Sequence, residues 1–400
     1  MSDHTYNLQP RDRLFLRDAR PMAASDAGLG ANWPRPDQLW NAIINAFHRA
    51  WPGPKLQSWE GAAHTKRATD KHQDSSFRFG ALKTLGPFPS KDDEIYFPFP
   101  LDWNMEIVPL DWNMEIVPCA GTDLPAPLTH AFRAMTIGKA DHPQWLSLSD
   151  YTRYLAGESF EPIKPDLYDE ERTIGIAINP ETGTTGDDDH KLYQAEYLRL
   201  RPDVSLAFTA SCKITPKGDV CVTVDDVFKL PDAPQELILG GQQGVAGLTA
   251  RAAELRLPQA KITTQYLRWT LLSPAVFSAG WLPGWCRDSR KAPEAPLGTV
   301  MLREASASLI AARVGKPLPF SGWDLQSKGP KPTVLAVPAG SCYVFDCETV
   351  EKARTLAALL HGRPRSDRFG EKGFGIGVCS SVGTQDSGPR PQPESPSSAS

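Results

Sequence analysis

Residues 363–378 combine the groups that hold phosphate in many proteins, namely closely spaced glycines and several cations. Glycine has no Cβ, so its backbone reaches positive φ and approaches a ligand closely. Successive N–H groups in such a turn form a concavity that suits an anion, and an aromatic ring adds a face for stacking. The candidate phosphate- and base-binding residues of this stretch are Arg368, Gly370, Lys372, Gly373, Phe374, Gly375 and Gly377.

Two interpretations of this glycine-rich stretch remain open. It lacks the GxxxxGK[ST] pattern, which excludes a nucleotide P-loop. Either the loop cradles phosphate, or it is a flexible turn with solvated charges. A second strand-to-glycine junction, at Gly240 and Gly241, predicts another close approach of the backbone to a ligand.

The ionisable residues form no catalytic motif. The eight histidines lie in polar contexts without HExxH or a nucleophile elbow, and only His48, on an expected helix, merits a test as a general base. Residues 187–190 (DDDH) resemble a metal cluster, but a hairpin tip with solvated acids is the favoured interpretation, because metal ligands must converge from packed elements. The sequence therefore predicts no catalytic residue, metal or cofactor.

The elements next to the glycine-rich stretch in the sequence must position it. Two β-rich runs, 333–337 and 342–345, are separated by Pro-Ala-Gly, which predicts a hairpin. Apolar residues then recur at helical spacing over 350–360, with Thr349 as the cap. The predicted order is hairpin, helix, glycine-rich loop and a final strand at 374–379.

The N-terminal part predicts a strand, a loop and a helix. A short apolar run lies at 14–16, and apolar residues from Leu39 to Trp51 fall on one helical face. Residues 52–138 are rich in Pro, Gly, Lys and Asp, which predicts an elaborated insertion without a core of its own. Further expected elements are a helix within 145–155 and strands at 173–178, 192–200, 206–210 and 220–224.

An exact tandem repeat lies within that insertion. Residues 101–109 read LDWNMEIVP, and residues 110–118 read the same. An odd period would point the copies of one continuous strand at opposite faces, and the prolines interrupt a ladder. We expect one copy to have a structural place and the other to bulge out as a loop.

Composition limits the classes of function. A net charge of −4 in 400 residues excludes a bulk polycation, so any nucleic-acid site must be a local basic patch. The seven cysteines form no CxxC motif, which favours reduced, buried thiols in a cytosolic protein. No apolar run is long enough for a transmembrane helix. Residues 381–400 are rich in Gly, Ser, Pro and Gln, which predicts a disordered tail.

Six segments in order resemble one protein family. They are residues 12–22 (DRLFLRDARPM), 169–200, 239–246 (LGGQQGVA), 271–281 (LLSPAVFSAGW), 327–345 and 371–377 (EKGFGIG). Together they resemble the third subunit of the Cmr, or type III-B CRISPR, effector complex, in the RAMP superfamily. Two features depart from the family pattern. Gln242, Gln243 and Gly244 follow the paired glycines where acidic and arginine residues are usual, and the tandem repeat is peculiar to this chain.

The resemblance implies an α+β fold of two ferredoxin-like (RRM-like) β-α-β units. We expect an N-terminal unit at 1–258, with the insertion at about 52–138, and a C-terminal unit at 259–380. It further implies a cytoplasmic, non-catalytic subunit that holds the 5′ repeat-derived tag of the guide RNA (crRNA). It implies contact with the large polymerase-domain subunit on one side and with the backbone subunit on the other.

Under this hypothesis, cations outside the glycine-rich loop add to the RNA site. Arg17 and Arg20 follow the first expected strand, although a surface ion pair with Asp18 is the plainer alternative. Lys328 and Lys331 supply a further rim of the RNA site. The alternative is that both lysines lie in a solvated loop. Two other functions stay open. One is a metal-independent RAMP endoribonuclease that matures guide RNA, and the other is a scaffold whose glycine-rich loop touches protein.

Overall fold

The structure of the chain is a computed structural model. It describes residues 4–16, 33–50, 66–69, 73–76, 82–103, 105–109, 127–134, 142–176, 178, 181–184, 192–214, 222–224, 227–229, 233–286, 298–303, 305–324 and 329–382. Several predictions fall outside these residues: those for Arg17, Arg20 and Lys328, for the acidic segment 187–190, for the repeat copy 110–118 and for the tail beyond Val382.

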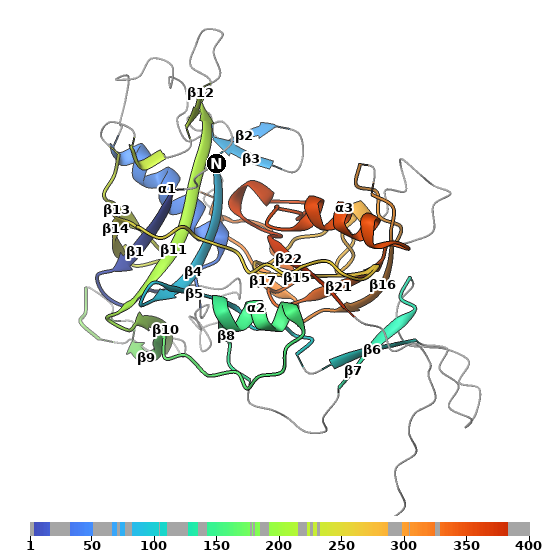
Figure 1. Ribbon diagram of the computed structural model, residues 1–400. Helices are drawn as coiled ribbons and strands as arrows, with labels where there is room; N and C mark the ends of the chain where they lie inside the picture. Colours follow the sequence, from blue (N-terminus) through green and yellow to red (C-terminus); the bar gives the residue numbers. More distant parts are fainter. Residues whose placement is uncertain are drawn as a thin grey trace, which may run out of the picture.

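An antiparallel eight-stranded sheet forms the first half of the molecule (Figure 1). Seven strands lie in the order β13 (Glu236–Ile238), β14 (Val245–Ala250), β1 (Thr5–Pro10), β11 (Val204–Ile214), β4 (Lys83–Lys91), β5 (Glu94–Pro98) and β8 (Trp145–Ser147), and β12 (Val222–Val224) pairs with the end of β11. A 3₁₀ turn, η2 (Val227–Lys229), follows β12.

A four-stranded antiparallel sheet forms the second half. Its order is β16 (Ser308–Arg313), β21 (Cys342–Asp346), β15 (Tyr266–Leu271) and β22 (Gly377–Ser381). The chain changes sheet between Ala250 and Tyr266. Both halves contribute to one hydrophobic cluster, in which Phe88 and Phe97 of the first half meet Leu272 and Val378 of the second.

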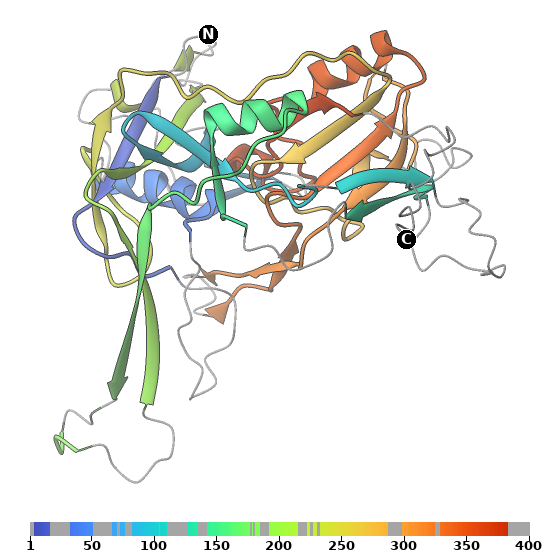
Figure 2. The same ribbon diagram turned by 60° about the horizontal axis from the view of Figure 1, so that its bottom comes forward.

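Five two-stranded ribbons complete the described sheets. They are β2 (Lys66–Thr69) with β3 (Gln73–Ser76), β6 (Met105–Pro109) with β7 (His130–Ala134), β9 (Tyr168–Ile176) with β10 (Leu192–Leu200), β17 (Leu318–Phe320) with β20 (Val334–Ala336), and β18 (Trp323–Asp324) with β19 (Gly329–Pro330). The β9–β10 hairpin projects away from the body (Figure 2). Two further 3₁₀ turns are η3 (Gly284–Cys286) and η4 (Gly370–Lys372).

Helix α1 (Pro36–Ala50) covers the first sheet and confirms the predicted helix. Its stripe of Leu39, Trp40, Ile43 and Phe47 is fully buried against β1 and β11, where each such side chain contributes about 1.5–3 kcal/mol. The strand before it differs from the prediction. The first strand is β1, and the apolar run at 14–16 forms only single β-bridges.

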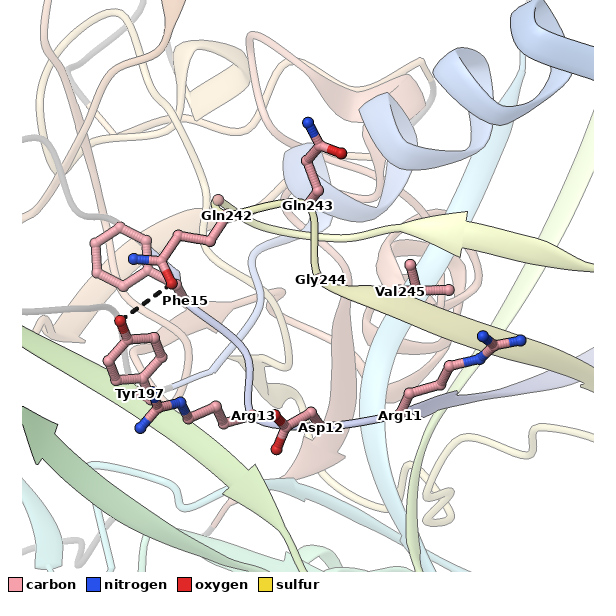
Figure 3. Close-up of a pocket in the computed structure, with 10 residues that line it drawn as sticks. Arg11, Asp12, Arg13, Phe15, Tyr197, Gln242, Gln243, Gly244 and Val245 are labelled. Carbon is pink, nitrogen blue, oxygen red and sulfur yellow. Dashed lines mark hydrogen bonds between the residues drawn. The ribbon is translucent and has the colours of Figure 1, made fainter.

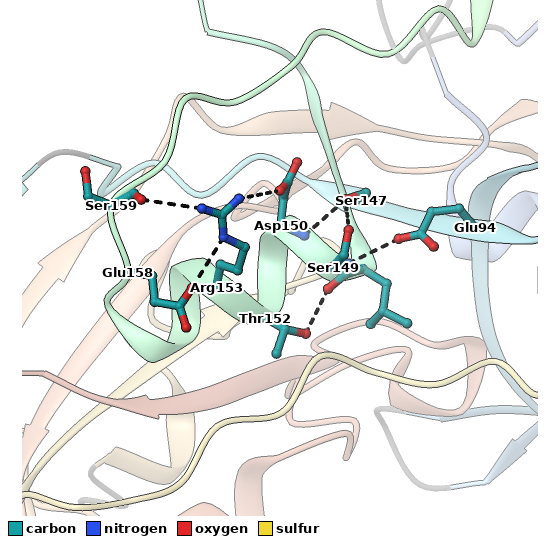
Figure 4. Close-up of polar contacts among 9 residues, drawn as sticks. Glu94, Ser147, Ser149, Asp150, Thr152, Arg153, Glu158 and Ser159 are labelled. Atoms are coloured by element: carbon teal, nitrogen blue, oxygen red, sulfur yellow. Dashed lines mark hydrogen bonds and ion pairs between the residues drawn. The ribbon is translucent and has the colours of Figure 1, made fainter.

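Helix α2 (Leu148–Ala156) begins later than the sequence suggests, because Trp145–Ser147 pairs with β5 as strand β8. The Ser147 side chain accepts a hydrogen bond from the Asp150 N–H at 3.1 Å and caps the helix (Figure 4). Gly157 ends it with a left-handed φ of 77°.

Helix α3 (Val350–Leu360) confirms both the predicted range and the cap, since the Thr349 side chain accepts from the Lys352 N–H. The hairpin predicted before it is wrong. β20 pairs with β17, whereas β21 pairs with β15 and β16, so the Pro-Ala-Gly segment joins two different sheets.

The predicted insertion at 52–138 is also wrong in its central part. β4 lies inside the large sheet between β11 and β5, with Phe88 buried. The prolines and glycines that suggested a loop are tolerated because Gly86 has a φ of 100° and packs against the Ala207 carbonyl of β11. Among the described residues, no helix is long and apolar enough to cross a membrane.

Candidate functional site

A cavity of about 380 Å³ opens where the end of β1, the β13–β14 turn and β10 meet (Figure 3). Leu14 exchanges two backbone hydrogen bonds with Leu198 of β10, and the Gly241 N–H donates to the Phe15 carbonyl at 2.7 Å. These bonds fix the three segments around the cavity. Its lining residues are Arg11, Asp12, Arg13, Phe15, Tyr197, Gly241, Gln242, Gln243, Gly244 and Val245.

The β13–β14 turn is held close to the β1 extension. Gly240 has a φ of 79°, and a Cβ there would lie 2.5 Å from the Phe15 carbonyl oxygen. Gln242 and Gln243 both have positive φ, of 54° and 55°. Such conformations cost about 1–3 kcal/mol each in residues other than glycine, and they concentrate at functional sites. The backbone does approach closely at the paired glycines, but its partner is the Phe15 carbonyl of the protein, and the contact with a ligand stays a prediction.

The turn leaves backbone donors at the cavity. Neither the Gln242 N–H nor the Gln243 N–H donates to an oxygen within the described part of the chain. The Gln242 side chain instead accepts from the Tyr197 hydroxyl at 3.1 Å, whereas the Gln243 side chain points away from that ring (Figure 3). Two adjacent free N–H groups are an anion-binding arrangement.

Arginine and aromatic side chains form the other wall. The Arg13 guanidinium lies 3.9 Å from the centre of the Tyr197 ring, and the Phe15 ring lies 5.5 Å from the same ring. Arg13 Nη1 is also 3.4 Å from Glu171 Oε2. Arg11, at the opposite end of the cavity, pairs with Glu236. This wall therefore offers two cations and the partly exposed Phe15 ring next to the free N–H groups, whereas Tyr197 is buried and supports the Arg13 guanidinium.

The carboxylates beside the cavity stay ionised. The pKa of Glu171 is lowered by its hydrogen bond to Arg199 and, less strongly, by Arg13. The pKa of Asp12 is lowered by a hydrogen bond from the Arg13 backbone and then by Arg199, whose Nη1 lies 2.9 Å from Asp12 Oδ1. The Arg199–Asp12 pair is exposed and the Arg13–Glu171 pair is half-buried. Pairs that reach solvent contribute about 0–1 kcal/mol, so an incoming anion can replace the exposed carboxylate at low cost.

The glycine-rich loop has a different role from the one predicted. The N–H groups of Lys372, Gly373, Phe374 and Gly375 all donate to carbonyl oxygens of the protein. The Phe374 ring is fully buried and packs 5.4 Å from the ring of Phe320. This loop is therefore not an open phosphate cradle, and base stacking on Phe374 is contradicted by its burial.

The same loop joins the two halves of the molecule. The Thr84 hydroxyl of β4 donates to the Lys372 carbonyl at 3.0 Å, and a Cβ on Gly373 would lie 2.7 Å from the Thr84 carbonyl oxygen. Lys372 is only 3% exposed, with its ammonium 5.0 Å from the Trp40 ring of α1. Gly373 is needed for close packing against β4, whereas Gly375 and Gly377 allow close packing against Ser366 and Trp269 within the second half.

The remaining predicted residues do not gather with the cavity. Arg368 is half-buried with its guanidinium 5.1 Å from the Phe369 ring, and Gly370 opens the η4 turn. Gly377 begins β22, where a Cβ would meet Trp269 Nε1. Lys331 pairs through its backbone with Gly322. Of the predicted residues within the described ranges, only Gly241 lines the cavity, with Gly240 beside it.

Sequence reasoning missed Arg11, Arg13 and Tyr197. Arg11 and Arg13 immediately precede the apolar run 14–16, so a search around that run in both directions would have found them. Tyr197 carries no local signal, because only the pairing of Leu198 with Leu14 brings β10 to the cavity. His48 lies on α1, but its side chain is outside the described set. Among the described residues, no group of three or more His, Cys, Asp or Glu could hold a metal ion.

Comparisons with known proteins bear on the identity of the chain. It is similar to a chain of the type III-B Cmr-beta complex bound to cognate target RNA and AMPPnP, with 14% identity and a TM-score of 0.44, over 85% of this chain and 86% of that one. It is also similar to a chain of the Csm3–Csm4 subcomplex of the type III-A interference complex, with 12% identity and a TM-score of 0.40, over 85% and 92% of the two chains. No curated protein matches.

The family comparison covers nearly the whole chain. The model of CRISPR-associated protein (Cas_Cmr3) matches residues 6–380. This match contains all six segments on which the resemblance rested, and it confirms that resemblance. The chain belongs to the Cas_Cmr3 family of CRISPR-associated proteins.

Proposed function

We propose that this chain is a non-catalytic, cytoplasmic RNA-binding subunit of a type III-B CRISPR effector complex, and that it holds the 5′ repeat-derived tag of the guide RNA. Membership of the Cas_Cmr3 family supports a role in a CRISPR effector. The observation that carries the RNA contact is the cavity between β1, β10 and the β13–β14 turn. The RNA site of this proposal is therefore that cavity instead of the glycine-rich loop.

The groups at the cavity match single-stranded RNA. Phosphate oxygens accept hydrogen bonds, and the N–H groups of Gln242 and Gln243 are free to donate them. Arg13 supplies a charge and a planar guanidinium that rests on the Tyr197 ring, and Phe15 supplies a partly exposed aromatic ring. Single-stranded RNA is commonly read by stacking on such rings and guanidinium planes together with contacts to the base edges.

We further propose that each half of the molecule is a ferredoxin-like unit. In the first sheet, β14, β1, β11 and β4 are neighbours in that order, with α1 between β1 and β4 in the sequence. In the second sheet, β22, β15, β21 and β16 have the equivalent order, with α3 between β21 and β22. Numbered by position in each unit, both orders are 4-1-3-2, with all neighbours antiparallel.

The proposal includes a bridging role between the large polymerase-domain subunit and the backbone subunit. Omitting this chain from a co-expressed complex should separate the large subunit from the backbone subunit. Size-exclusion chromatography of the tagged large subunit, followed by analysis of the co-eluting chains, measures this. Co-elution of the backbone subunit in full amount without this chain would contradict the bridge.

The RNA contact is tested with a matched pair of arginine variants. Arg13→Gln removes one cation from the cavity, and Arg172→Gln removes one cation from the β9–β10 hairpin, where Arg172 pairs with Glu196 at 2.9 Å. In the assembled complex, Arg13→Gln should reduce retention of guide RNA and lower the salt slope of tag binding by about 0.7. Arg172→Gln should leave both unchanged.

Three outcomes separate this proposal from its alternatives. Equal RNA retention and salt slopes in the two variants, with normal melting temperatures, would support a scaffold without RNA contact. Cleavage of labelled precursor RNA by the purified subunit in EDTA would support the metal-independent endoribonuclease. A loss confined to Arg13→Gln, with intact RNA recovered, supports the tag-holding function.

A further inference from the structure

The first copy of the tandem repeat fills a well-defined place in the fold. The Leu101 N–H donates to the Gly340 carbonyl at 2.9 Å. The Asp102 carboxylate lies 2.9 Å from Arg268 Nη1 and accepts from the Tyr154 hydroxyl at 2.5 Å. Asp102 is only 4% exposed. We call this place, occupied by residues 101–109, the repeat slot.

The rest of the first copy is also bound by residues elsewhere in the chain. The Trp103 ring packs 4.7 Å from the Phe160 ring. Ile107 is 2% exposed and packs with Ile310 and Val344 of the second sheet. Met105–Pro109 pairs with His130–Ala134 as the β6–β7 ribbon. None of these partners belongs to the repeat, so the slot exists independently of which copy fills it.

The second copy has the same residues in the same order and the same preceding proline. Residues 100–109 and residues 109–118 both read PLDWNMEIVP. Residue for residue, Asp111 would meet Arg268 as Asp102 does, and Ile116 would replace Ile107. The residue before each copy also takes part: the Pro100 carbonyl accepts from the Trp103 N–H at 3.4 Å, and the Pro109 carbonyl can repeat that bond with Trp112.

We propose that the two copies exchange in the repeat slot, so that the protein has two registers related by a nine-residue shift of the chain. In the first register, residues 110–129 connect the slot to β7. In the second, residues 100–108 loop out after Phe99, and residues 119–129 connect the slot to β7. Phe99 and Leu101, on either side of that junction, are both partly exposed, and the buried place of Pro100 between them is filled by Pro109 in the second register.

The two registers differ mainly in their loops, since their slot contacts are the same. Dividing one long connection into two shorter ones requires a second loop closure, which has its own entropic cost. The first register is therefore the major one, in agreement with the copy that the structure places in the slot. The second register is a minor state, and it becomes populated when a substitution weakens the contacts of the first copy with the slot.

Single substitutions in each copy test the exchange. Asp102→Asn and Asp111→Asn each remove one copy of the carboxylate, and the double variant removes both. Asp111→Asn should leave the melting temperature unchanged. Asp102→Asn should lower it by clearly less than the double variant does, because Asp111 then occupies the slot. Ile107→Ala, Ile116→Ala and their double variant provide a milder set with the same expected order.

Hydrogen exchange measured by mass spectrometry follows the register directly. In Asp102→Asn the two copies differ in mass, so their peptides can be distinguished. Amide protection should move from residues 101–109 to residues 110–118 in this variant. A double variant that fails to fold, while Asp102→Asn folds with protection moved, also supports exchange. If Asp102→Asn loses as much stability as the double variant, or fails to fold while Asp111→Asn folds, the exchange does not occur.

Discussion

At the residue scale, His361 couples the folded state to pH. Its Nδ1 accepts a hydrogen bond from the Cys379 N–H at 3.2 Å, which requires an unprotonated nitrogen. Burial lowers the pKa of His361 from its ordinary value of 6.5. The folded state therefore binds this proton less tightly than the unfolded state does.

The sign of the pH dependence follows from that direction. Between the lowered folded pKa and 6.5, the unfolded chain binds more protons, so stability falls as the pH is lowered through this window. Urea unfolding at pH 7 and pH 5 should show a smaller loss of stability in His361→Leu than in the unmodified chain. His142→Leu, at an exposed histidine, is the control and should keep the full loss. Equal losses of stability between pH 7 and pH 5 in all three proteins would contradict the assignment of this pH dependence to His361.

Residue-scale prediction from sequence succeeded where the chemistry was local. Thr349 caps α3 as expected, because capping depends on the three residues that follow the cap. It failed for Phe374, whose glycine-rich surroundings suggested exposure but which is fully buried in a cluster with Val276 and Phe320 of the second half. A glycine pattern shows that the backbone comes close to something, and the pattern is the same whether that partner is RNA or another strand.

At the element scale, the glycine-rich loop is expected to behave as a packing element. Gly373→Ala places a Cβ 2.7 Å from the Thr84 carbonyl oxygen at a φ of 89°, so the variant should lose more than about 1 kcal/mol of stability. Gly370→Ala is the matched control, because its Cβ would have its nearest contact at 3.4 Å, with Pro364. Denaturant unfolding without RNA measures both.

The control sharpens the interpretation of that experiment. Loss of stability in Gly373→Ala alone, in the absence of RNA, indicates packing between β4 and the loop. If Gly373→Ala keeps full stability but loses RNA retention, the result would support the phosphate-binding role that the sequence suggested for the loop.

Elements with strong periodicity were predictable, and their partners were not. The helices α1 and α3 follow from apolar residues at helical spacing. Strand β4 was missed because its prolines and glycines do not resemble a central strand, yet pairing with β11 on one side and β5 on the other decides its conformation. The predicted hairpin of β20 and β21 failed for the same reason, since pairing is a tertiary property.

At the scale of the whole molecule, an ion pair connects the two halves. Arg268 of β15 contacts Asp102 of the first repeat copy, Ser380 of β22 and the Tyr154 carbonyl of α2. Arg268→Met would leave a carboxylate buried without its partner, which typically costs about 3–5 kcal/mol. Urea unfolding should show a loss of that size, and the exposed-pair variant Arg172→Met should change stability by less than about 1 kcal/mol. A small effect of Arg268→Met would mean that water reaches Asp102.

The overall arrangement was predictable only through family resemblance. Six ordered motifs supplied the family, and the expectation of an α+β fold came with that resemblance. The cavity was beyond reach, because Arg13, Tyr197 and Gln242 come from segments far apart in the chain that meet only in the folded sheet.

The projecting β9–β10 hairpin has a practical consequence for handling the purified chain. Ile174 and Ile176 are 72% and 47% exposed, and Ile178 beyond them is 58% exposed. Alternation along the strand puts these side chains on one face. A protein that carries such an apolar strip on a protruding ribbon is prone to reversible clustering as its concentration rises. Light scattering across a dilution series should detect this, and Ile174→Thr with Ile176→Thr should yield a monodisperse sample, because threonine keeps the strand while making its face polar.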